Sequence, residues 1–208
     1  ASVVRFKLSE AGLLEEVPLH VIEDDRVVTL DPFSFRFVRL THSIPEPNGI
    51  VLSTEAGTVF HTGDWKIDKD PMVGEEIDSA EMEAIGNQNI QALVCDSTNV
   101  FQEGVAGSEK QVRENLIEIV KNHQKGRIIV TCFASNVARL ESVAVAAKAI
   151  GHKVVALGKS IVRMEKAARE NGYLKEIEPF LNPREVSNMS PDSLLYVATG
   201  SQGEARAS

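Results

Sequence analysis

The sequence predicts an α/β fold built from two parts, and the pattern of apolar residues leads to this prediction. Up to about residue 74, the chain contains segments in which apolar and polar residues alternate, which is the period of half-buried β-strands. From residue 92 onward, short and uniformly apolar segments alternate with segments of helical period. Apolar strands separated by helices are typical of a parallel sheet covered on both faces. We therefore expect a β-rich part followed by a part with a parallel sheet.

The first clearly marked strand is expected at residues 33–40. Large apolar and polar residues alternate there, and the pattern stops just before Pro45 and Pro47, which interrupt strand pairing. His42 is therefore expected to lie at the end of this strand.

Two further strands are expected at residues 49–53 and 58–62. The loop between them has the length of a hairpin connection and contains Gly57, which can adopt a positive φ. The second strand leads directly into Gly63 and Asp64. Imidazole and carboxylate groups are suitable ligands for a divalent metal ion. A histidine and an aspartate at such strand ends are therefore candidate metal ligands.

The second part of the chain shows a repeated alternation of strands and helices. In order, we expect a strand at 92–96, a helix between Ser108 and Gly126, a strand at 127–133, a helix at 136–150 capped by Ser135, a strand at 153–157, a helix at 160–170 and a strand at 193–198. Ligands of parallel sheets gather at the carboxyl ends of the strands. Asp96, Ser135 and Ser201 follow such ends and are therefore candidate site residues.

Charge and composition limit the kinds of protein to which the chain can belong. The net charge of −8 argues against a broad surface that coats nucleic acid, because such binding relies on clustered Lys and Arg. It does not exclude a nuclease with a narrow channel. No apolar run approaches the roughly 20 residues of a membrane span, and the amino terminus has no apolar signal segment, so we expect a cytoplasmic protein without membrane contact. Cys95 and Cys132 lie in apolar runs and are expected to be reduced core residues.

Several short motifs occur in the order and at the spacing of one known family. They are residues 41–49 (Thr-His-Ser-Ile-Pro-Glu-Pro-Asn-Gly), 61–66 (His-Thr-Gly-Asp-Trp-Lys), 96–99 (Asp-Ser-Thr-Asn), 133–137 (Phe-Ala-Ser-Asn-Val) and 199–204 (Thr-Gly-Ser-Gln-Gly-Glu). With these motifs the chain resembles ribonuclease J, a ribonuclease of the metallo-β-lactamase fold with a β-CASP domain. The resemblance runs from about residue 5 to the C-terminus.

The resemblance implies a domain organisation. Residues 1–74 are expected to be part of an αββα metallo-β-lactamase domain. Residues 75–208 are expected to form a Rossmann-like β-CASP domain that is incomplete at its C-terminal side. The metallo-β-lactamase fold also uses an upstream His-x-His-x-Asp-His motif, which these 208 residues do not contain. The chain is therefore expected to be a central fragment that is inactive on its own.

Carried over to this sequence, the resemblance implies a site with two zinc ions. His42 would bind one zinc ion and Asp64 would bridge the two, while a hydroxide held between them would attack the scissile phosphorus. Asp96 would be the acidic residue of the first β-CASP motif, which orients a histidine used as general acid. Asp64 and Asp96 are thus the candidate catalytic residues. His42 and Asp64 alone are expected to hold zinc poorly.

The resemblance also implies a pocket for the 5′ end of RNA. Phe133 is expected to stack on a base. Ser135 and Asn136 stand at a helix start, where backbone amides can face a phosphate. Ser201 and Gly203 belong to a loop rich in backbone amides that can cradle phosphate.

The expected function of the parent protein is that of a zinc-dependent ribonuclease in RNA processing, including ribosomal RNA, and in RNA decay. We expect 5′-to-3′ exonuclease activity, with endonuclease activity as a second expectation, RNA as the partner and a homo-oligomeric full-length protein. Two alternatives stay open. One is a β-CASP nuclease that acts on DNA, and the other is a non-catalytic module that binds nucleotide or phosphate. Trp65 stands where this family often has phenylalanine, so the details of RNA contact stay open as well.

Overall fold

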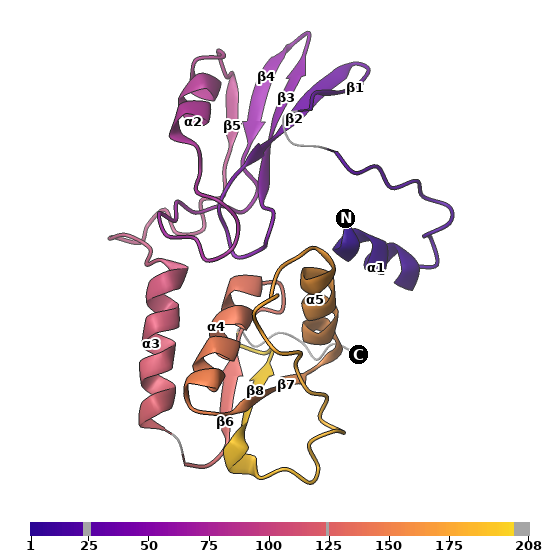
Figure 1. Ribbon diagram of the computed structural model, residues 1–208. Coiled ribbons are helices and arrows are strands. Elements are labelled where there is room, and N and C mark those ends of the chain that lie inside the picture. The colour runs from indigo at the N-terminus through magenta and orange to yellow at the C-terminus, as the bar shows by residue number, and fades with distance from the viewer. Residues whose placement is uncertain (23–25, 124, 202–208) are drawn as a thin grey trace. The chain divides into compact units, whose positions relative to one another are not determined.

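The computed structural model describes residues 1–22, 26–123 and 125–201 and has the expected mixed α/β architecture (Figure 1). The chain divides into two compact units. The five-stranded unit comprises His20–His42 and Glu46–Ser108, and the three-stranded unit comprises Ala1–Leu19, Ser43–Pro45 and Glu109–Ser208. Each unit has its own sheet and its own hydrophobic core.

The sheet of the five-stranded unit has the strand order β1-β2-β3-β4-β5. Its strands are β1 (Val28–Leu30), β2 (Phe33–Arg39), β3 (Asn48–Thr54), β4 (Gly57–His61) and β5 (Ala92–Val94). The first four strands pair in antiparallel fashion, whereas β5 pairs with β4 in parallel. Since β2 and β4 both run opposite to β3, the strands β2, β4 and β5 all end at the same edge of the sheet.

Helix α2 (Ser79–Gly86) packs on this sheet and completes its core. The buried side chains of the core are Val38, Leu40, Val51, Phe60 and Ile85. Asp78 caps α2, because its side chain accepts hydrogen bonds from the backbone amides of Ala80 and Glu81. Glu81 also pairs with Arg36 of β2 at 2.6 Å, which ties the helix to the sheet.

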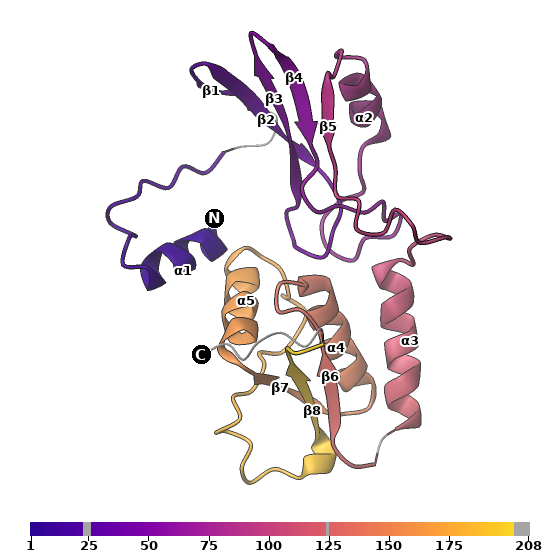
Figure 2. The same ribbon diagram turned by 180° about the vertical axis from the view of Figure 1, so that it is seen from behind.

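The sheet of the three-stranded unit has the order β6-β8-β7, and all its strands are parallel (Figure 2). Its elements are α1 (Ser2–Glu10), α3 (Glu109–Asn122), β6 (Ile128–Thr131), α4 (Val137–Ala149), β7 (Lys153–Leu157), α5 (Lys159–Glu170), the 3-10 helix η1 (Pro191–Ser193) and β8 (Leu194–Ala198). The expected parallel sheet is therefore confirmed. In the described ranges of the chain, no helix is both long and apolar enough to cross a membrane.

Both faces of the three-stranded sheet are buried. Alternate residues of β7 and β8 point to opposite faces, because the side-chain period of a strand is two residues. Val154 and Leu195 join a core formed with helices α3, α4 and α5. Val155 and Leu194 join a second cluster on the other face. An irregular segment that includes Val186 covers this second face.

A single arginine holds the loop that follows α5. One guanidinium nitrogen of Arg169 donates to the carbonyl oxygens of Leu174 and Ile177 at 2.8 and 2.9 Å. Its Nε donates to Glu165 at 3.0 Å, and this carboxylate also accepts the backbone amide of Phe180. This network satisfies backbone carbonyl groups of a loop that lies outside helices and strands.

The two compact units do not divide at the expected domain boundary between residues 74 and 75. Helix α2 and strand β5 follow this boundary but pack in the five-stranded unit, because β5 pairs with β4. Helix α1 precedes it but belongs to the three-stranded unit, where Glu10 pairs with Arg163 of α5. The assignment of 1–74 and 75–208 to two domains stays a prediction.

Leu195 lies in the central strand of the three-stranded sheet and is fully buried. We expect Leu195→Ala to lower the free energy of unfolding by about 2–5 kcal/mol, because the truncation removes apolar contacts and leaves a cavity. Val162→Ala on the exposed side of α5 is the matched control and should change it by less than about 0.5 kcal/mol. Urea unfolding followed by circular dichroism measures both. Equal changes in the two variants would contradict this account of the core.

Candidate functional site

The carboxyl edge of the five-stranded sheet carries the segments that contain His42, Asp64 and Asp96. His42 follows β2, Asp64 follows β4 and Asp96 follows β5. All of these strands end at the same edge, so the segments after them start close together. Strand β3 separates β2 from β4, and hydrogen bonds beyond the sheet therefore have to join their loops.

Thr41 makes the connection between the loops after β2 and β4. Its carbonyl oxygen accepts the backbone amide of Lys66 at 2.8 Å, and its hydroxyl donates to the Lys66 carbonyl oxygen. The same hydroxyl accepts the backbone amide of Asp68 at 3.3 Å. Thr41 is buried, so these bonds are shielded from water. The backbones next to His42 and Asp64 are thus held together.

Thr62 connects the loops after β4 and β5. The backbone amide of Thr62 donates to the carbonyl oxygen of Val94 at 2.9 Å, which continues the parallel ladder by one step. The hydroxyl of Thr62 accepts the backbone amide of Asp96 at 3.2 Å. These bonds fix the backbone of Asp96 relative to the loop that carries Asp64.

The Asp96 carboxylate accepts hydrogen bonds from the next turn of its own loop. The hydroxyl and the backbone amide of Thr98 donate to its Oδ1 at 2.6 and 2.9 Å. These two bonds lower the pKa of Asp96, and the neighbouring His42 and the backbone of Trp65 lower it further. Asp96 is therefore ionised at neutral pH and lies within electrostatic range of His42.

Asp64 differs from Asp96 because its side chain is exposed. In the described part of the chain, the Asp64 side chain makes no hydrogen bond or ion pair, so its position depends on its backbone neighbours.

The residues at this edge suit zinc in kind but not in number. Imidazole and carboxylate are zinc ligands, but a catalytic zinc ion takes about three ligands from the protein. Among the residues that the structure describes, no three His, Cys, Asp or Glu side chains are placed to hold a metal ion. His42 and Asp64 can therefore contribute ligands to a zinc site but do not complete one.

Sequence reasoning missed three threonines that organise this edge: Thr41, Thr62 and Thr98. Thr98 carries a local signal, because a hydroxyl two residues after an aspartate commonly bonds back to it in a turn. Thr41 and Thr62 carry no such signal, since their partners lie more than 20 residues away in the sequence.

The carboxyl edge of the three-stranded sheet carries the second set of predicted residues. Phe133, Ser135 and Asn136 follow β6, and Ser201 follows β8, which is the neighbouring parallel strand. The backbone amide of Cys132 donates to the carbonyl oxygen of Ala198 at 3.0 Å and extends this pairing. Phe133 is exposed and Asn136 is buried. Gly203 lies outside the described residues.

The cap of helix α4 is Asn136 and not Ser135, so the expected cap was wrong. The side-chain oxygen of Asn136 accepts the backbone amide of Arg139 at 2.8 Å. Both residue types are good caps, and the structure uses Asn136. Ser135 is therefore not used as a cap.

A partly buried ion pair involves Arg139 in the first turn of this helix. The guanidinium of Arg139 donates to the carboxylate of Glu109, with nitrogen-to-oxygen distances of 3.2–3.3 Å.

Both cysteines are free, as expected. Burial raises the pKa of Cys132 to about 11, so its thiol stays protonated. Cys95 is only half-buried, and its assignment to the core was therefore wrong.

A cavity of about 310 Å³ lies next to Ser135 in the three-stranded unit. Its walls come from helix α1, helix α5 and the loop after β6, and they include Phe6, Ser160, Arg163 and Met164. The walls thus combine apolar surface with hydroxyl and guanidinium groups.

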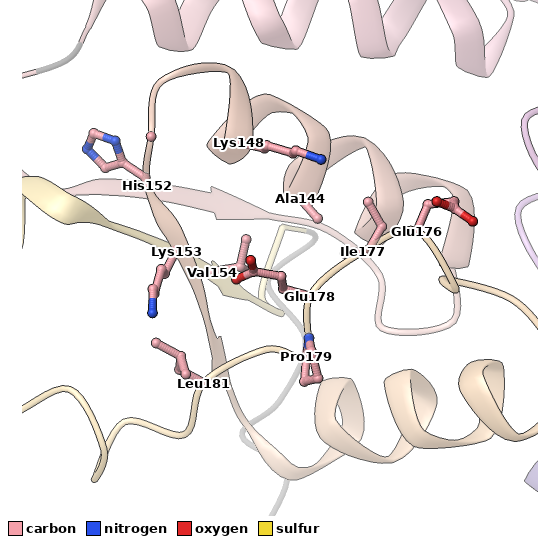
Figure 3. Close-up of a pocket in the computed structure, with 11 residues that line it drawn as sticks. Ala144, Lys148, His152, Lys153, Val154, Glu176, Ile177, Glu178, Pro179 and Leu181 are labelled. Atoms are coloured by element: carbon pink, nitrogen blue, oxygen red, sulfur yellow. The ribbon is translucent and has the colours of Figure 1, made fainter.

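Figure 3 shows another cavity of the three-stranded unit, with a volume of about 280 Å³. It lies at the start of β7, whereas the predicted residues lie at the carboxyl ends of the strands. The charged side chains around it are Lys148, Lys153, Glu176 and Glu178. This cavity contains none of the predicted site residues.

Comparison with known proteins gives a consistent result. Residues 125–208 match the family model described as ribonuclease J, beta-CASP domain. Ribonuclease J of Sinorhizobium meliloti is 44% identical over 207 residues, which cover 95% of this chain and 36% of that protein. Ribonuclease J 1 of Streptococcus pyogenes is 38% identical, with coverages of 99% and 37%. Ribonuclease J of Thermus thermophilus is 35% identical, with coverages of 97% and 35%.

The chain belongs to the ribonuclease J family. It spans about a third of the length of the ribonuclease J proteins that it matches. The β-CASP match begins before β6 and includes the whole three-stranded sheet together with α4 and α5.

A solved structure shares the fold of this chain. It is titled as a protein of unknown function from Enterococcus faecalis V583 and superposes with a TM-score of 0.58. The superposition covers 87% of this chain and 45% of that chain, at 13% sequence identity. At this identity the likeness concerns the fold.

The hydrogen bonds of Asp96 predict how its pKa responds to mutation. Thr98→Val removes the hydroxyl donor and should raise the pKa of Asp96 toward its ordinary value, because the carboxylate loses its shortest hydrogen bond. Thr98→Ser keeps the donor and should leave the pKa low. Carbon-13 NMR titration of the carboxyl group measures both variants. The same titration midpoint in the valine variant and the wild type would show that the hydroxyl does not act on Asp96.

Proposed function

We propose that the protein carrying this chain is a zinc-dependent ribonuclease of the ribonuclease J type with 5′-to-3′ exonuclease activity. Endonuclease activity is the second activity of the proposal. The observation that carries it is the common edge at which His42, Asp64 and Asp96 follow their strands in a chain of this family. The process served would be the processing and decay of RNA in the cytoplasm.

In this proposal His42 and Asp64 supply two of the zinc ligands. Zinc, when bound, activates a water molecule and neutralises negative charge that develops on the phosphate. The exposed carboxylate of Asp64 is accessible for this purpose, and the Thr41 bonds support it by holding its loop against the loop of His42. The remaining zinc ligands would come from residues outside this set.

Asp96 would serve as the orienting acid of the site. Its bonds from Thr98 occupy Oδ1 and keep the group ionised, so the carboxylate can accept a further hydrogen bond. A carboxylate that accepts a hydrogen bond from an imidazole fixes the orientation of the ring. This arrangement supports the role of Asp96 as a residue that holds a histidine general acid in place.

RNA would be held at the carboxyl edge of the three-stranded sheet. The exposed ring of Phe133 offers a surface on which a base can stack, and Ser135 and Ser201 offer hydroxyl groups. Asn136 would act through its cap, which fixes the helix start and its backbone amides. Gly203 would contribute a backbone amide. The full-length protein would be a homo-oligomer.

The metal ligands are tested by the decay of end-labelled 5′-monophosphate RNA with the whole protein and added zinc. We expect progressive loss from the 5′ end, and His42→Ala and Asp64→Ala should each lower the rate by at least about a hundredfold. Changes to residues that merely hold a metal ligand in place already cost about 10–100-fold. A matched DNA should be cleaved far more slowly if the 2′-hydroxyl is recognised.

His20→Ala and Glu55→Ala are the controls for these variants, because both side chains are exposed and lie outside the candidate edge. They should retain the activity of the wild type. Intact RNA in the presence of zinc and wild-type protein would overturn the enzyme proposal. Preferential decay of the DNA would assign the activity to a deoxyribonuclease.

The stacking role of Phe133 is tested with a second exposed phenylalanine as the control. Phe133→Ala should raise the KM for RNA by roughly 5- to 150-fold, which corresponds to a loss of about 1–3 kcal/mol of stacking. Phe33→Ala should leave the KM unchanged. Phe33 is a matched control because it is 47% exposed and Phe133 is 46% exposed. Initial-rate kinetics measure both, and equal KM values for the two variants would remove Phe133 from the RNA site.

A further inference from the structure

Trp65 and Cys95 form a side-chain contact between the two loops that carry the candidate carboxylates. The indole Nε1 of Trp65 donates to Sγ of Cys95 at 3.2 Å. The thiol in turn donates to the carbonyl oxygen of Asp96 at 3.3 Å. Trp65 directly follows Asp64, and Cys95 directly precedes Asp96. The contact therefore joins the backbones on which both carboxylates are mounted.

Trp65 is itself held by the core of the five-stranded unit. Its ring packs against the cluster that contains Leu40, Phe60 and Ile85. Trp65 and Cys95 also line an apolar cavity of about 400 Å³ between the sheet and α2. The indole is thus fixed on its apolar side, and its single polar group is directed at the thiol, since a partly buried indole N–H requires an acceptor.

The Asp64 side chain depends on this anchoring more than Asp96 does. Asp96 is held by Thr62 and Thr98, whereas the Asp64 carboxylate makes no bond among the described residues. The Asp64 backbone is bounded on its C-terminal side by Trp65. The Trp65 indole is therefore the anchored side chain that directly follows Asp64 in the chain.

We infer that Trp65 and Cys95 are a pair of positioning residues that set the separation between the Asp64 and Asp96 carboxylates. Neither residue needs to touch RNA for this role. Its consequence for catalysis rests on the proposed ribonuclease function. The contact itself is a property of the five-stranded unit and is measurable without any activity.

The first experiment measures the contact in the 208-residue chain by fluorescence. Trp65 is its only tryptophan, and a thiol next to an indole quenches the emission. Cys95→Ala and Cys95→Ser should both raise the emission intensity. Cys132→Ala is the matched control, because Cys132 is the other cysteine and lies in the three-stranded unit, and it should leave the intensity unchanged. Unchanged emission in both Cys95 variants would overturn the contact.

The second experiment measures the positions of the carboxylates by carbon-13 NMR of Asp64 and Asp96. Trp65→Phe removes the donor and Cys95→Ala removes the acceptor, and both should shift the carboxyl resonances. Cys95→Ser keeps an acceptor and should retain the wild-type resonances. Wild-type resonances in both the phenylalanine and the alanine variant would overturn the positioning role, whether or not the protein cleaves RNA.

The third experiment measures kcat and KM for RNA in the whole protein. Trp65→Phe and Cys95→Ala should each lower kcat about two- to tenfold at unchanged KM, as expected for the loss of one hydrogen bond that orients the site. The double variant should lose no more than either single variant, and Cys95→Ser should recover most of the rate. Losses that multiply in the double variant would overturn the pair. An inactive wild type with intact NMR and fluorescence effects would overturn the proposed function alone.

Discussion

The parallel pairing of β5 with β4 is the constraint on which the candidate site depends. Two parallel strands end at the same edge of a sheet, so the loops that carry Asp64 and Asp96 begin side by side. An antiparallel β5 would place Asp96 at the opposite edge. The hydroxyl of Thr62 can bridge the two loops only because this pairing has brought the Asp96 amide within reach. The direction of the strands thus brings the two loops together, and the hydrogen bonds of the site then fix their positions.

In the three-stranded unit, too, parallel strands end at a common edge of the sheet. Its sheet is buried on both faces, so the loops at its carboxyl edge are mounted on a closely packed base. The side chain of Asn136 caps the first turn of α4, and the ion pair between Arg139 and Glu109 also holds this turn. Several guanidinium groups in this unit pair with carboxylates, as at Arg139 and Arg163. In the proposed ribonuclease, this pairing and the net charge of −8 favour RNA binding through backbone amides and a few side chains over binding through a basic surface.

Much of the fold could be predicted because its signals are local. The alternation in β2, the apolar runs of β7 and β8 and the helical period of α3 each lie within a few neighbouring residues. The segment from Leu181 to Met189 could not be predicted, because it has no period and its apolar residues pack on the second face of the sheet. Helix α1 shows the same limit. Its apolar residues do not indicate that its partner is α5.

The sequence by itself determined the α/β class, the parallel sheet, the family and the placement of His42, Asp64 and Asp96 after strand ends. These follow from short-range patterns and from motifs with fixed spacing. Only the tertiary structure decided that Thr41 joins the loops after β2 and β4, that Trp65 donates to Cys95 and that Asp96 lies within electrostatic range of His42. The physical reason is that these contacts join residues far apart in the chain, and strand order and direction, which no local pattern encodes, bring them together.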